Sequence, residues 1–137
     1  DLDAIKNMAI ASSLMGINLA YSSTCLPHRI QYFIGPLTNT SHAQGLIALY
    51  KGWIKLISEN KYKSGLNDLE IDLGIDYNLV EKINHLKENL NIDYSLSTLG
   101  VNENQIEYIA ENILGSVQND PIYKSNETII KILKESI

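Results

Sequence analysis

Two histidines, His28 and His42, are the residues of this sequence whose type and spacing could bind a metal. They lie 14 positions apart, and a single uninterrupted helix would separate them by about 21 Å, too far to share one ion. Between them, Gly35-Pro36 predicts the end of the helix that carries His28. The polar residues at 39–41 then offer N-cap positions for a second helix. A helix–turn–helix of this kind could fold His42 back towards His28.

The predicted position of His42 suits a metal ligand. It would lie in the first turn of its helix, where the partial positive charge of the helix end disfavours imidazolium. Neutral imidazole is the form that binds metals. Two histidines are fewer than the three or four protein ligands of a usual site, however. Spacing alone therefore leaves a second interpretation open, in which one histidine belongs to the core or a helix cap and the other to the surface.

The composition is typical of one folded domain. The chain has 137 residues, of which 45% are hydrophobic, so it can bury a core. Its net charge of −5 argues against nucleic acid or an anionic membrane as the main partner. It contains no long apolar run and no signal-peptide pattern, and we therefore expect a cytoplasmic protein. Cys25 is the only cysteine, and we expect a small, buried, unreactive side chain there.

Helical periodicity predicts an all-α fold, a bundle of about seven helices. The first helix, at about 2–21, is apolar around most of its circumference, so we expect it to be buried at the centre of the bundle. The next two, at about 26–34 and 41–58, carry the two histidines, and Trp53 is expected to be part of the core. Because this apolar helix begins almost at residue 1, the chain is expected to be a fragment of a longer one.

Five shorter elements are predicted in the second half of the chain. The first is a short helix through 66–73 that stops at Gly74, and the second is a helix capped by Asp76 with the apolar stripe Leu79, Ile83, Leu86 and Leu90. A helical turn at 95–100 follows, and then a helix at about 103–114 that an Asn102–Gln105 capping box opens. After a break at Asn119-Asp120-Pro121, Ser125 caps the last helix. His85 falls opposite the apolar stripe, so we exclude it from the site. No glycine-rich dinucleotide fingerprint is present.

With these elements placed, the sequence resembles the C-terminal helical domain of iron-containing (group III) alcohol dehydrogenases. The segment D-A-I-K-N-M-A-I-A-S-S-L-M-G-I-N is similar to that family's A-R-x-x-M-x-x-A-S-x-x-A-G-x-A helix, although Ile5 stands where arginine is usual. The interval between His28 and His42 matches the two C-terminal metal-ligand histidines of the alcohol dehydrogenase branch. Related glycerol dehydrogenases and dehydroquinate synthases space this pair more widely. The runs L-S-T-L-G-V and N-D-P-I-Y-K-S-N-E-T-I-I-K-I-L resemble the family's tail.

The resemblance implies an NAD(P)-dependent oxidoreductase that acts on a small alcohol or aldehyde. In such an enzyme His28 and His42 would bind a divalent metal, iron or alternatively zinc. The family's other two ligands, an aspartate and a histidine four residues apart, would precede Asp1, as would the N-terminal nucleotide-binding domain that binds most of the NAD(P). The 137 residues would thus be a single helical domain, inactive alone, and the complete enzyme could form a homo-oligomer.

The sequence also departs from the family's pattern. Many members have a histidine near the nicotinamide at the position of Tyr32, and a tyrosine with an ordinary pKa of about 10 is a poorer base at neutral pH. We therefore expect Tyr32 to shape the nicotinamide edge of the cleft. The sequence around His28, L-P-H-R-I-Q-Y-F-I-G-P, differs from the family's common motif H-A-L-x-x-P-L-G, and Ala43 follows His42 where glycine is usual. The alternative function is a non-catalytic helical interaction module or a degenerate relative.

Overall fold

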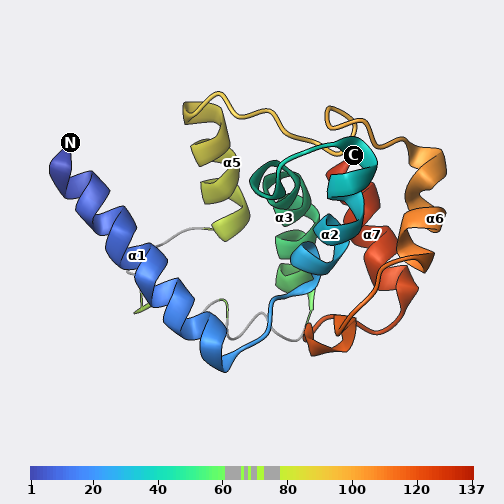
Figure 1. Ribbon diagram of the computed structural model, residues 1–137, viewed down its shortest axis with the longest axis horizontal. Coiled ribbons are helices and arrows are strands. Elements are labelled where there is room, and N and C mark those ends of the chain that lie inside the picture. Colours follow the sequence, from blue (N-terminus) through green and yellow to red (C-terminus); the bar gives the residue numbers. More distant parts are fainter. Residues whose placement is uncertain (61–65, 67, 69–70, 73–77) are drawn as a thin grey trace.

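A computed structural model describes residues 1–60, 66, 68, 71–72 and 78–137, and the described residues contain helices but no strand. The α-helices are α1 (Leu2–Tyr21), α2 (Leu26–Thr38), α3 (His42–Glu59), α5 (Leu79–Asn89), α6 (Ile106–Glu111) and α7 (Asn126–Ser136), with two 3₁₀ turns, Glu103–Gln105 and Val117–Asn119 (Figure 1). The all-α prediction is confirmed for this part of the chain. The predicted stop at Gly74 and cap at Asp76 lie outside the described residues.

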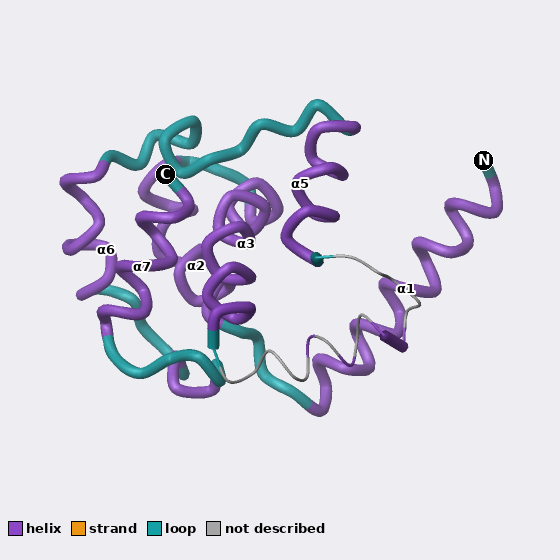
Figure 2. The backbone as a smooth tube through the Cα atoms, turned by 180° about the vertical axis from the view of Figure 1, so that it is seen from behind, coloured by secondary structure: helices purple, strands orange, loops and turns teal. Residues whose placement is uncertain are grey.

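The core lies where α2, α3, α6 and α7 pack together (Figures 1 and 2). Each of these helices turns one apolar stripe inward, as the helical period requires. The core side chains are Leu26, Ile30, Ile34, Ala48, Leu49, Leu96, Leu99, Val101, Ile106, Ile109, Ala110, Ile122, Ile129, Ile132 and Leu133. Trp53 packs against this cluster, as predicted.

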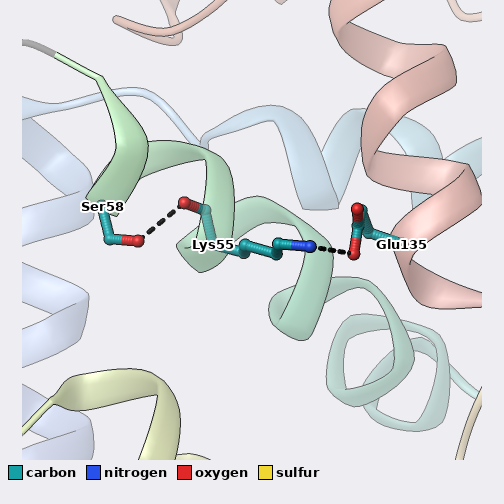
Figure 3. A network of polar contacts seen from close by, with 3 residues as sticks. All are labelled: Lys55, Ser58 and Glu135. Atoms are coloured by element: carbon teal, nitrogen blue, oxygen red, sulfur yellow. Dashed lines mark hydrogen bonds and ion pairs between the residues drawn. The ribbon is translucent and has the colours of Figure 1, made fainter.

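The contact between α3 and α7 depends on a glycine. A Cβ atom on Gly52 would lie 2.5 Å from the backbone oxygen of Ile132, so only glycine lets the two helices approach this closely. At the surface of the same contact, the Lys55 ammonium donates to the Glu135 carboxylate at 2.6 Å, and the Ser58 hydroxyl donates to the Lys55 carbonyl (Figure 3). Exposed ion pairs add little stability, so backbone proximity and apolar burial hold α3 against α7.

The prediction that the first helix is buried was wrong. All residues of α1 are exposed, with Leu2 at 82% and Met8 at 71%, and a Cβ atom on Gly16 would meet nothing within 4 Å. Figure 1 shows α1 at the left, apart from the bundle, and Figure 2 shows the same separation from behind. Apolar residues around a helix indicate that it can be buried, but they do not show that this chain supplies the covering surface.

The predicted end of α2 at Gly35-Pro36 was also wrong, because the helix continues to Thr38 with Pro36 inside it. Proline removes one backbone donor but does not prevent the next turn from forming. The helix ends where Asn39 takes up a left-handed conformation, with φ 54° and ψ 34°. The backbone N–H groups of Asn39 and Thr40 then both donate to the Gly35 carbonyl.

The capping predictions were more accurate than the predictions of burial. Ser41 and Gln44 form a full capping box at the start of α3, Asn102 and Gln105 form the expected one, and Ser125 caps α7. Two residues of the apolar stripe predicted for the helix at Asp76, Leu86 and Leu90, are each 58% exposed. His85 is solvated beside Glu88, as expected.

Two smaller features differ from the sequence prediction. Residues 96–100 form turns rather than a helix, ending at Gly100 with φ 93°. The helix expected to continue to Leu114 ends at Glu111, and Leu114 is 83% exposed. Within the part of the chain that the structure describes, no helix combines the length and apolarity needed to cross a membrane.

Candidate metal centre

The structure brings His28 and His42 into direct contact. α2 carries His28 in its first turn, and α3 begins at His42. The Nδ1 atom of His28 lies 3.0 Å from the Nε2 atom of His42, and the ring centroids are 5.0 Å apart. Two residues separated by 14 positions in sequence thus direct ring nitrogens at each other. The helix–turn–helix achieves the juxtaposition that the sequence pattern allowed.

The surroundings of His28 favour its neutral imidazole. Burial, and then the nearby His42 and the charge of Arg29, lower the pKa of His28 below its ordinary value of 6.5. At 3.0 Å, the N–H of one ring can donate to the lone pair of the other. The lowered pKa favours the neutral ring of His28, which is the form that binds a metal.

A buried glutamine fixes the spacing of the two helices beside the histidines. Gln31 is only 2% exposed, and its amide nitrogen donates to the Ser41 carbonyl at 3.3 Å. A Cβ atom on Gly45 would lie 1.5 Å from the Gln31 amide oxygen, so glycine at 45 leaves the space that this amide occupies. The Gln31 oxygen itself has no hydrogen-bond partner. This close contact sets how near α2 approaches α3.

A buried carboxylate anchors the start of α2. Cys25, at the N-cap position, makes no side-chain cap, and Asp120 supplies one from the other end of the sequence. One carboxylate oxygen accepts from the Leu26 N–H at 2.7 Å and from the Trp53 indole at 2.9 Å, while the other accepts from the Ile122 N–H at 3.1 Å. The positive end of the helix dipole stabilises this charge. Asp120 thereby fixes the turn that carries His28.

The sequence indicated Asp120 only as part of a helix break. Its partners lie 94 and 67 positions away, and no local pattern reveals a cap supplied over that distance. A buried carboxylate needs donors, and those of Asp120 come from the start of α2, from Trp53 on α3 and from the neighbouring Ile122.

The environment of Cys25 disfavours its thiolate. Burial, together with the negative charge of Asp120, raises the pKa of its thiol to about 11. The thiolate is the reactive form, so the raised pKa lowers the reactivity of this thiol at neutral pH. The interpretation of Cys25 as an unreactive packing residue agrees with this environment, although the side chain is only partly buried.

Tyr32 and Arg29 complete the surface around the histidines. The Tyr32 ring stacks on His42 with centroids 5.6 Å apart and an interplanar angle of 16°, and the side chain is 53% exposed. The Arg29 guanidinium carbon lies 5.8 Å from the centre of the Tyr32 ring. Tyr32 therefore covers one face of His42 and lies beside the pair. Sequence reasoning did not identify Arg29.

The two nitrogens fit a shared metal ion. Metal–imidazole bonds are about 2.0–2.1 Å long, so two such nitrogens on one ion lie about 2.8–3.4 Å apart for angles between about 90° and tetrahedral. The observed 3.0 Å lies in this range. Among the described residues, no group of three or more His, Cys, Asp and Glu side chains is placed to hold a metal. The contacting pair in the described part of the chain thus presents two candidate ligand nitrogens.

Comparisons with known proteins agree with the resemblance noted in the sequence. The family model for the "Fe-containing alcohol dehydrogenase family, C-terminal" matches residues 1–137. Neither the comparison with curated proteins nor that with solved structures gave a match. The family match covers every residue that positions the histidine pair, from Gln31 and Gly45 to Asp120. This chain belongs to the Fe-containing alcohol dehydrogenase family, of which it is C-terminal sequence.

Proposed function

We propose that the chain is the helical, metal-binding half of an NAD(P)-dependent, iron-type alcohol dehydrogenase with a dehydroquinate synthase-like C-terminal fold. The observation that carries the proposal is the 3.0 Å separation of the His28 and His42 ring nitrogens in a chain that matches this family along its length. The lowered pKa of His28 supports it, because a neutral ring can donate its lone pair.

In this proposal the chain's own residues hold and shield one side of the reaction centre. His28 and His42 would provide two imidazole ligands for iron, with zinc as the alternative. A metal at this site would supply Lewis acidity at the oxygen of an alcohol or aldehyde during hydride transfer. Tyr32 would cover the exposed face of His42 and form the nicotinamide edge of the cleft. Asp120 would keep His28 in place through the start of α2.

The remaining parts of the enzyme would come from an N-terminal nucleotide-binding domain and its following helix, which would add an aspartate and a histidine ligand. The uncovered apolar surface of α1 supports a partner of this kind, since Met8, Leu14 and Met15 are 60–71% exposed. On this view the 137 residues alone are inactive. The complete protein would act in the cytoplasm, where it could form a homo-oligomer.

The exposed α1 also favours a second candidate, a non-catalytic helical module that binds another protein. In that case the histidine contact would be structural, with one ring simply donating a hydrogen bond to the other. The two candidates differ in what the loss of one histidine would do. The enzyme would lose turnover, whereas the module would keep its partner.

The test is NAD(P)H-linked reduction of small aldehydes by the full-length protein, compared with His28→Ala and His42→Ala. His85→Ala is the matched control, because His85 is solvated on α5. We expect both site variants to lose at least about 100-fold in kcat/KM, since the metal's contribution amounts to several kcal/mol, while the control keeps wild-type activity. Equal measurable activity in all four proteins would refute the metal-ligand role of His28 and His42, and no activity in any of them would favour the interaction module.

A further inference from the structure

Arg29 is the only arginine of the sequence, whose other basic residues are lysines, and it directly follows His28. Arginine carries a permanent charge and five N–H donors in a planar fork that matches a carboxylate. The structure pairs one of these donors with a protein acceptor, since Nη2 donates to the Ser23 hydroxyl at 3.3 Å. The buried Nε atom has no partner.

This guanidinium has no carboxylate partner among the described residues, in contrast to Lys55, which pairs with Glu135. The chain is not short of acids, because it contains 16 Asp and Glu residues. A partly buried cation without a counter-charge is costly for a fold. An arginine without a carboxylate partner in the described structure can bind an anion that another molecule supplies.

The position of Arg29 links it to the histidine pair. Its guanidinium lies 5.8 Å from the Tyr32 ring centre, and that ring stacks on His42 at 5.6 Å. On its other side lies Gly115, where a Cβ atom would come within 3.4 Å of Nη1. Gly115 has a φ of 96°, which also favours glycine. The cation is thus held at the rim of the centre, against an aromatic face and a glycine that leaves it room.

We propose that Arg29 determines substrate specificity by binding a carboxylate carried by the substrate, so that the enzyme acts on an alcohol or aldehyde that is also an organic acid. This proposal rests on the dehydrogenase function proposed above. The same anionic chemistry could come from a phosphate of the nucleotide cofactor. The nearness of Arg29 to the histidines favours the substrate, because under the proposed function the nucleotide-binding domain would hold the cofactor's phosphates.

The kinetic test uses the full-length protein with two aldehydes of equal chain length, 4-oxobutanoate and butanal, which differ by the carboxylate. Wild type should prefer 4-oxobutanoate. Arg29→Gln should lower kcat/KM for 4-oxobutanoate about 10- to 100-fold, the effect of a charge-assisted hydrogen bond, and change that for butanal less than about twofold. Arg29→Lys should fall between, because it keeps the charge but loses the fork. Lys131→Gln, on the exposed face of α7, controls for lost charge.

A loss of the same size for both aldehydes in Arg29→Gln, or no wild-type preference, would overturn the assignment and leave the dehydrogenase function standing. A binding measurement separates the remaining cases. The Nε–H signal of Arg29, assigned by its absence in Arg29→Lys, should shift saturably with succinate. A shift with inorganic phosphate alone, or with neither anion, would overturn the carboxylate site. If neither aldehyde is reduced, the dehydrogenase proposal fails, and the succinate titration still decides whether Arg29 binds carboxylate.

Discussion

Replacement of Gly45 by alanine tests how the two histidines are held together. A methyl group at 45 would lie 1.5 Å from the Gln31 amide oxygen. Gln31 cannot retreat easily, because it is 2% exposed and its amide nitrogen lies 2.9 Å from where a Cβ atom on Gly35 would be. Overpacking of this kind costs about 1–3 kcal/mol. Alanine's better helix propensity, about 1 kcal/mol, offsets part of this, so we expect a net loss of about 0–2 kcal/mol.

The double variant Gln31→Ala/Gly45→Ala is the control. In a Gln31→Ala background the clashing amide is gone, and Gly45→Ala should be neutral or stabilising by up to about 1 kcal/mol. The resulting coupling energy should be about 1–3 kcal/mol. Urea unfolding followed by circular dichroism measures all four proteins. If the Gly45→Ala penalty is the same with and without Gln31, the proposed steric contact between α2 and α3 is refuted.

Three further predictions concern the residues around the site. Asp120→Ala should cost about 2–3 kcal/mol, because its charged carboxylate accepts hydrogen bonds from buried donors; a urea midpoint equal to that of wild type would contradict the capping role. Since folding lowers the pKa of His28 below 6.5, the unfolded chain binds more protons there, and stability should fall as pH drops from about 6.5 towards the lowered pKa. His28→Gln should reduce this acid sensitivity, so parallel pH profiles for variant and wild type would count against it. With its pKa raised from 9.0 to about 11, Cys25 should react with iodoacetamide at pH 8 roughly 100-fold more slowly than in urea-unfolded protein, and equal rates would show that the thiol is not shielded.

Local signals in the sequence predicted the helices and their caps well. Ser41, Asn102 and Ser125 could be identified because a cap involves residues only two or three positions apart. The meeting of His28 and His42 could be anticipated for a similar reason, since one turn connects their helices. The end of α2 was misplaced because Gly35-Pro36 is a strong stop signal, yet Asn39 provides the left-handed residue that ends the helix.

Long-range contacts could not be predicted from the sequence. Asp120 caps a helix that begins 94 positions earlier, and the fit of Gln31 over Gly45 appears only when α2 and α3 are packed. The prediction that α1 is buried was wrong for a related reason. Its apolar residues indicate a surface suited to burial, but whether anything covers them is decided by other segments.

The most direct test of the account is the metal content of the purified full-length protein, measured by elemental analysis for wild type, His28→Ala, His42→Ala and the His85→Ala control. If His28 and His42 form half of a metal site, wild type and His85→Ala should each contain about one iron or zinc per chain. Each of the other two variants should lose metal affinity by at least about 10-fold, since even secondary contacts to a metal are worth this much. Stoichiometric metal retained in both His28→Ala and His42→Ala, or absent from wild type under metal-replete conditions, would contradict the account.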